Sequence, residues 1–177
     1  MTQLSQDQKI KIESLFKNNK FSELEFEIES ISSFESRSAF LANMLGVVKL
    51  RKPSITQKDF EEARKLFKDS YEKDPNYIDA MCNLGHVSLK LRNYEYIFKD
   101  LKRFVKNKGY NAKIYETLAR IFFFVGQVEE ALDLYKKMAD EGDLSQDASA
   151  NFLCSLNYSS NFSQSEYLDY CKKINLK

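Results

Sequence analysis

The stretches NLGHVSLKLRNYEYIFKDLKRF (83–104) and TLARIFFFVGQVEEALDLYKKM (117–138) align without a gap, 34 positions apart. A leucine recurs at Leu84 and Leu118, and a small residue, glycine or alanine, follows it in both stretches. A small residue at this point lets two helices pack closely, because a larger side chain would push their backbones apart. The alignment therefore predicts a repeated unit of two helices.

The same step relates further positions of the chain. A first unit begins with its own Leu–Gly pair, and its second helix arrives five residues late because of an insertion near 52–56. The register is then restored until Pro75, where a helix pair must stop because proline cannot continue a helix. The matched positions are Leu45 and Gly46 in the first unit; Ala63, Ile97 and Ala131; and Phe67, Leu101 and Tyr135.

The composition indicates a folded, helical protein. Hydrophobic residues make up 43% of the chain and charged residues 30%, so disorder is not expected. Five glycines and two prolines are too few for the many tight turns of a sandwich or barrel. Short amphipathic segments predict an all-α fold of about ten helices. Beyond a helix pair within 5–33, helices are expected at about 37–51, 57–73, 77–91, 94–107, 111–125, 128–141, 146–157 and 164–175.

Capping signatures mark several of the expected helix starts. In a capping box, Ser or Thr and a Glu or Gln three residues later satisfy free backbone N–H groups reciprocally. A hydrophobic staple adds an apolar contact across the first turn. The predicted boxes are Ser5 with Gln8, Ser22 with Glu25 and Ser163 with Glu166; Ser145 is a further cap, and Phe21 with Phe26 is the predicted staple.

Charge, cysteines and hydropathy exclude several classes of partner. The net charge is +1, without the basic excess that phosphate binding needs, so no nucleic-acid partner is predicted. Cys82, Cys154 and Cys171 are widely spaced, which favours free thiols in a reducing compartment over a zinc site or disulfides. The longest apolar run, at 121–125, is too short to span a membrane, and no secretory signal is present. We therefore predict a cytoplasmic protein without metal or membrane.

No constellation of catalytic residues stands out. His86 is the single histidine, so a histidine-based metal cluster or a Ser–His–Asp triad would have to rely on this one residue. Cys82 lies one turn before it, but no oxyanion-hole loop accompanies the pair. Phosphate-binding glycine motifs and Asp-x-Asp are absent from the sequence. We therefore predict no catalytic residues, no cofactor and no enzymatic activity of this chain alone.

The repeated positions resemble the tetratricopeptide repeat, a helix–turn–helix unit of 34 residues, over about 39–143. Ser88, Ile97 and Gly109 depart from its pattern, which prefers an aromatic residue, alanine and proline there. The resemblance implies antiparallel helix pairs stacked as a short right-handed solenoid in a single domain. The expected parts are an N-terminal pair or cap (5–33), a repeat with the insertion near 52–56 (37–75), a degenerate repeat (78–109), a third repeat (112–143) and a C-terminal capping pair (146–175).

The resemblance also implies a concave face lined by the first helix of each pair. The residues expected there are polar and mixed in charge, which suits an extended peptide whose backbone amides need hydrogen-bond partners. Lys113 lies near a position of the chaperone-type carboxylate clamp, but Cys82 and His86 stand where that clamp has lysine and asparagine. The predicted peptide-binding groove comprises Asn43, Asp79, Cys82, Asn83, His86, Lys113, Glu116, Thr117, Arg120 and Asn151.

Residues 151–170 resemble the junction of bacterial glycosyltransferases of the O-linked N-acetylglucosamine transferase type, through Asn-Phe-Leu, Leu-Asn-Tyr and a Ser-capped helix. In that family, asparagines at one repeat position hold the target backbone. Asn83 and Asn151 occupy this position with Thr117 between them, unless they are simply polar residues on a solvated face. The resemblance predicts a non-catalytic protein- or peptide-binding scaffold, either a substrate-recruiting fragment or a free-standing adaptor. A structural or self-associating component of a larger complex is the alternative.

Overall fold

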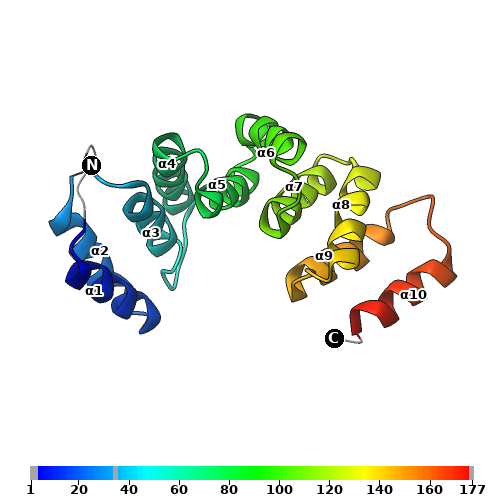
Figure 1. Cartoon of the computed structure of the whole chain (residues 1–177), viewed down its shortest axis with the longest axis horizontal. Coiled ribbons are helices and arrows are strands. Elements are labelled where there is room, and N and C mark those ends of the chain that lie inside the picture. Colours follow the sequence, from blue (N-terminus) through cyan, green and yellow to red (C-terminus); the bar gives the residue numbers. More distant parts are fainter. Residues whose placement is uncertain (1–3, 34–35, 176–177) are drawn as a thin grey trace. The chain divides into compact units, whose positions relative to one another are not determined.

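The computed structural model describes residues 4–33 and 36–175 of the chain. These residues form ten helices and no strand, which confirms the all-α prediction (Figure 1). The helices are α1 (Gln6–Lys17), α2 (Phe21–Ile31), α3 (Ala39–Lys49), α4 (Gln57–Lys73), α5 (Ile78–Lys90), α6 (Glu95–Lys108), α7 (Ala112–Phe124), α8 (Val128–Glu141), α9 (Gln146–Leu156) and α10 (Gln164–Asn175).

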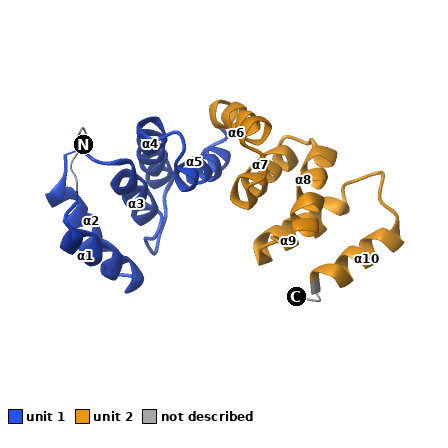
Figure 2. Ribbon diagram, in the orientation of Figure 1, with its two compact units in different colours: residues 1–93 blue, residues 94–177 orange. Residues whose placement is uncertain are grey.

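The chain divides into two compact units, with the boundary between Asn93 and Tyr94 (Figure 2). The first unit holds α1 to α5 and the second holds α6 to α10. Within each unit, helices that follow one another along the chain pack together, and the pairs α3–α5 and α7–α9 also touch. The boundary falls inside the repeat expected at 78–109, and the prediction of a single domain stays a prediction.

The core of the first unit depends on a close approach between α3 and α4. A Cβ atom at Gly46 would lie 2.5 Å from Cε1 of Phe67, closer than packed carbon atoms can come. The ring of Phe67, which is 2% exposed, therefore fills the space that the missing side chain leaves. The small residue after Leu45 has the role that the sequence predicts for it. The same unit buries Ile12, Leu24, Ile28, Leu41, Val48 and Leu66.

The core of the second unit is built around Tyr135 of α8 and Phe152 of α9. Both side chains are fully buried, and their ring centroids are 5.8 Å apart. Ala119 of α7 is buried beside them in the same cluster. Tyr170 of α10 packs edge-on against Phe152 at 5.0 Å, so the last helix covers the aromatic end of this core.

Three of the four predicted serine caps are confirmed. The Ser5 hydroxyl accepts from the Gln8 backbone N–H at 3.2 Å, and the Gln8 side chain accepts from the Ser5 N–H at 2.9 Å. Ser163 and Glu166 form the same reciprocal pair at the start of α10. Ser145 accepts from the Ala148 N–H at 3.0 Å.

The predicted cap and staple of the second helix are wrong. α2 already begins at Phe21 with Lys20 as its N-cap residue, so Ser22 lies inside the helix. Asn19 adopts a left-handed φ of 56°, which reverses the chain in fewer residues than a Ser22 cap requires. The Phe26 side chain is 75% exposed, and the ring of Phe21 instead packs against Phe16 at 6.0 Å.

Candidate functional site

In the first unit, the predicted groove residues of α3 and α5 bond to one another. The Asn83 Nδ2 donates to the Asn43 Oδ1 at 3.0 Å, and the Asn43 Nδ2 donates to the Tyr77 hydroxyl at 3.3 Å. Asn43 is only 7% exposed. These amides therefore tie α3 to α5.

The other predicted residues of the first unit all lie on α5. Cys82 is buried, with 5% of its surface exposed, while Asp79 and His86 are half-buried. All three take part in further interactions within the protein. The residues that the sequence predicts for a site on this unit therefore already take part in interactions within the protein.

In the second unit, α7 and the start of α9 meet at Glu116. Its Oε2 accepts from the hydroxyl of Ser145, the N-cap residue of α9, at 3.2 Å. Its Oε1 lies 3.9 Å from Nη1 of Arg120, one turn later on α7. The Arg120 side chain is 35% exposed, and Glu116 is its only ion-pair partner among the described residues. Lys113, one turn earlier, is exposed.

Thr117 and Asn151 occupy the same repeat position but differ in environment. Thr117 is 1% exposed, and its hydroxyl donates to the Lys113 carbonyl at 2.8 Å, so it is not part of the surface. Asn151 is half-buried, and its side-chain amide makes no hydrogen bond with any described residue. Of the predicted asparagine positions, Asn151 alone presents an amide that is not already bonded inside the protein.

A hydroxyl that the sequence did not single out lies beneath this face. The Tyr135 side chain is fully buried, and its hydroxyl has no hydrogen-bond partner among the described residues. Burial raises the pKa of this hydroxyl; the positive charge of Arg120 opposes the shift and the negative charge of Glu116 adds to it.

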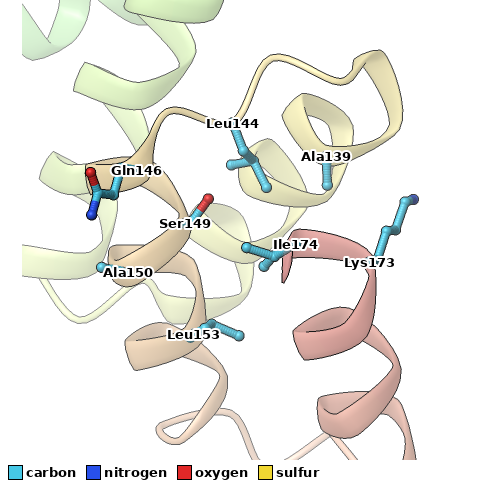
Figure 3. Close-up of a pocket in the computed structure, with 8 residues that line it drawn as sticks. All are labelled: Ala139, Leu144, Gln146, Ser149, Ala150, Leu153, Lys173 and Ile174. Carbon is cyan, nitrogen blue, oxygen red and sulfur yellow. The ribbon is translucent and has the colours of Figure 1, made fainter. Parts of the chain in front are cut away.

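A pocket of about 480 Å³ opens between α8, α9 and α10. Figure 3 shows Leu153 of α9 and Ile174 of α10 on facing helices, with Leu144 of the connecting loop beside them. Its volume falls in the range of small-ligand and side-chain pockets. No sequence motif predicts this pocket, because its lining residues come from three helices and a loop. The lining residues are Ala139, Leu144, Gln146, Ser149, Ala150, Leu153, Lys173 and Ile174.

One charged group stands at this pocket. The Lys173 ammonium donates to the Asp140 carboxylate at 2.7 Å, and this bond raises the pKa of Lys173. The other lining side chains are mainly aliphatic, so the pocket can take an apolar group and exclude water from it. Gln146, which lines the pocket, directly follows Ser145, whose hydroxyl bonds to Glu116 of α7. The pocket and Glu116 are therefore linked through the start of α9.

The structure adds two observations on other classes of site. The described part of the chain holds no group of three His, Cys, Asp or Glu side chains placed to bind a metal ion. Among its helices, none is both long enough and apolar enough to cross a membrane.

Comparison with known proteins places the fold. No known protein family matches the chain, and no curated protein does. Among solved structures, MamA of MSR-1 is 18% identical, with 95% of this chain and 92% of that chain covered and a TM-score of 0.68. YrrB, described as a TPR protein with an unusual peptide-binding site, is 18% identical over 92% of this chain and 80% of its own, with a TM-score of 0.66.

A third similar structure is TTC0263, a thermophilic TPR protein of Thermus thermophilus. It is 16% identical, covers 82% of this chain and 77% of its own length, and has a TM-score of 0.64. Likenesses at 16–18% identity establish the fold and nothing finer. The chain therefore has the helical-repeat fold of tetratricopeptide-repeat proteins.

Proposed function

We propose that this protein is a non-catalytic module that binds an extended peptide segment of a partner protein, and that the second unit holds the peptide. The observation that carries the proposal is the aliphatic pocket of about 480 Å³ between α8, α9 and α10; Asn151, with its unbonded amide, lies on α9 but does not line this pocket. An apolar side chain of the peptide would enter the pocket. The Asn151 amide, which can both donate and accept, would bond the peptide backbone next to it.

The polar residues of α7 extend this surface. Glu116 and Arg120 lie on one face of the helix, and the Glu116–Ser145 bond places that face next to the start of α9. A peptide across both helices would therefore meet an amide, two opposite charges and an apolar pocket within one unit. The peptide-binding site named for YrrB, which has a similar fold, supports the same use of the fold here.

The proposal is tested by selection from a phage-displayed library of random peptides of about ten residues, with the full chain as bait. We expect enrichment of peptides that carry leucine, isoleucine or methionine. Their affinity for the protein should fall at least tenfold in the variant Ser149→Phe, because the added ring fills the pocket.

The matched control is Ser165→Phe, an exposed serine of α10 that does not line the pocket. It adds the same ring to the same unit and should leave the affinity unchanged. Equal affinity of both variants, measured by fluorescence polarisation with a selected peptide, would remove the pocket from the proposal.

A second candidate function is self-association through the first unit. Phe26 of α2 is 75% exposed and Ile10 of α1 is 56% exposed, and large apolar side chains at the surface favour contact with another protein. If these two side chains join copies of the chain, the wild type should sediment as an oligomer. The double variant Phe26→Glu with Ile10→Glu should then sediment as a monomer. A wild type that remains monomeric at high concentration would argue against it.

A finer proposal is that the module recruits substrate for a glycosyltransferase. It rests on the resemblance of residues 151–170 to the junction in those enzymes. Reading the coding sequence beyond codon 177 tests it, since the proposal requires a transferase region to be encoded there.

A further inference from the structure

The size of the pocket between α8, α9 and α10 indicates how many side chains of a peptide it takes. Its volume is about 480 Å³. A cavity of about 150 Å³ already holds a benzene ring, so a single leucine or isoleucine side chain would leave most of this pocket empty. An apolar surface that faces empty space forfeits the dispersion contacts that a second side chain would make. The pocket therefore has room for two aliphatic side chains.

The length of the pocket along α9 sets the spacing of those two side chains. Gln146 and Leu153 both line it and are seven residues apart, which is about 10 Å along a helix axis. Between them α9 contributes only the small side chains of Ser149 and Ala150, and Figure 3 shows Ser149 and Leu153 on the side of α9 toward α10. In an extended peptide, side chains at positions i and i+2 point the same way, about 7 Å apart. Two alternate side chains of one extended segment therefore fit along α9.

Lys173 adds a charge to this apolar pocket. It is the one charged side chain among the described residues that line the pocket, and its bonding partner Asp140 does not line it. The ammonium has three N–H donors, and Asp140 accepts from it at 2.7 Å. The two side chains are 49% and 69% exposed, and an ion pair this exposed contributes little to stability. A second carboxylate can therefore reach the ammonium from solvent and share it with Asp140.

We propose that the pocket binds one extended segment through two apolar side chains two residues apart, and that the Lys173 ammonium binds the carboxylate of an aspartate or glutamate in the same segment. A carboxylate only accepts hydrogen bonds and an ammonium only donates them, so the two groups match in charge and in hydrogen bonding. The inference rests on the proposed function and names the sequence pattern of the peptide. The acidic residue also fixes the direction of the segment, because it must lie beside Lys173.

The first part of the test changes the peptide. A peptide selected from the library with the full chain is synthesised with each of its two apolar residues replaced in turn by alanine. Each replacement should lower the affinity about tenfold, as the loss of a buried aliphatic side chain does. Moving the second apolar residue by one position should cost as much, because its side chain then points to the opposite side of the segment. An apolar residue of the pair that can be replaced by alanine without loss would overturn the inference.

The second part compares the peptide with a version in which the acidic residue is replaced by the matching amide, Asn or Gln. The wild type should bind the acidic version about fivefold more tightly. Lys173→Met keeps an aliphatic side chain at the pocket but removes the ammonium, and it should bind the two versions equally. Asp140→Asn breaks the same ion pair and leaves the ammonium, so it should keep the preference. Lys172→Met is the matched control, since this neighbouring lysine is 74% exposed and does not line the pocket.

The variants separate a contact with the peptide from a structural role of the ion pair. If Asp140→Asn loses the preference as Lys173→Met does, the peptide depends on the ion pair and not on the ammonium, and the inference is overturned. It is equally overturned if the wild type binds both versions equally, if Lys173→Met keeps the preference, or if Lys172→Met loses it. In each of these cases the proposed function stands as long as Ser149→Phe still weakens binding, whereas a library that yields no binding peptide overturns both.

Discussion

The two units differ in the side chains that Asn83 and Asn151, and Phe67 and Tyr135, place at two positions of the repeat. In the first unit, Asn83 bonds to Asn43, and the buried core position of the repeat holds the hydrocarbon ring of Phe67. In the second, Asn151 makes no side-chain hydrogen bond with a described residue, and the same core position holds Tyr135 with an unpartnered hydroxyl. Polar groups that are satisfied internally stabilise a fold, and polar groups that are left open are available to a partner. The comparison supports the proposal that the second unit, and not the first, holds the partner.

The largest effect is expected where the two units differ in the small residue of the repeat. Gly46→Ala would set a methyl carbon 2.5 Å from the Phe67 ring, and such overpacking lowers the free energy of unfolding by about 3 kcal/mol. Ala119 stands at the matching position of the second unit, where Ala119→Gly should cost about 1 kcal/mol through the flexibility of glycine in a helix. Urea unfolding measures both.

Hydrogen exchange shows which helices lose stability in the Gly46→Ala variant. Faster exchange confined to α3 and α4, with α7 and α8 unchanged, is the expected outcome. A loss of stability no greater than that of Ala119→Gly would show that the Phe67 ring can move away.

The close packing of helix pairs was predictable from the sequence, because a close contact between helices requires a small residue at a fixed position of the repeat. Where α3 and α4 nearly touch, only the smallest side chain fits, so Gly46 marks the contact in the sequence itself. The serine caps are visible for a similar reason, since Ser5 and Ser163 serve the backbone within three residues of themselves. The Ser22 cap failed because the left-handed Asn19 shortened the turn. Asparagine adopts this conformation more readily than most residues, but its presence in a polar stretch does not fix the length of the turn.

The next largest effect comes from exchanging the two buried rings. Tyr135→Phe removes an unpartnered hydroxyl and should raise the free energy of unfolding by about 1 kcal/mol. The reverse change, Phe67→Tyr, adds a hydroxyl to a site that Phe67 already fills and should lower it by about 1–3 kcal/mol. Chemical denaturation followed by circular dichroism gives both values. Opposite signs support the comparison, and a destabilised Tyr135→Phe would refute it.

The candidate site was predictable only in part, and the reason lies in the kind of contact. The sequence places Asn83, Thr117 and Asn151 at one repeat position, but not which of them is bonded. That depends on neighbours distant in the chain, such as Asn43 for Asn83. The sequence identifies Tyr135 only as a core position of the repeat, and an aromatic residue there does not show that its hydroxyl lacks a partner.

A smaller effect is expected from the asparagines themselves. Asn83→Ala should lower the free energy of unfolding by about 1 kcal/mol, because Asn43 loses a partner in a site that is only 7% exposed. Asn151→Ala should change it by less than about 0.5 kcal/mol, since its side chain has no bond to lose. Peptide affinity should respond in the opposite order, weaker for Asn151→Ala and unchanged for Asn83→Ala. If both variants lose the same free energy of unfolding, the two asparagines do not differ in their bonding, and this contrast between the units is wrong.

The smallest effect concerns two capping boxes and their dependence on pH. Asp59 of α4 accepts from Lys52 at 2.8 Å and from Thr56, and these hydrogen bonds, led by that of Lys52, hold its pKa below the ordinary value of 3.8. The pKa of Glu166 is lowered too, chiefly by its hydrogen bonds with Ser163.

A carboxyl group whose pKa is lowered by folding stabilises the protein above its unfolded pKa. The contribution of Asp59 is therefore fully present near pH 7 and is lost as the pH falls below about 4 toward the folded value. Asp59→Asn should unfold more easily than wild type at pH 7, with the difference shrinking at pH 3. Glu166→Gln should show a smaller difference, because no lysine donates a hydrogen bond to Glu166. Added salt should weaken the Asp59 effect, since the Lys52 side chain is 41% exposed. Urea titrations across this pH range decide it: a pH-independent difference for Asp59→Asn would mean that the insertion near 52–56 is held by contacts other than this charge.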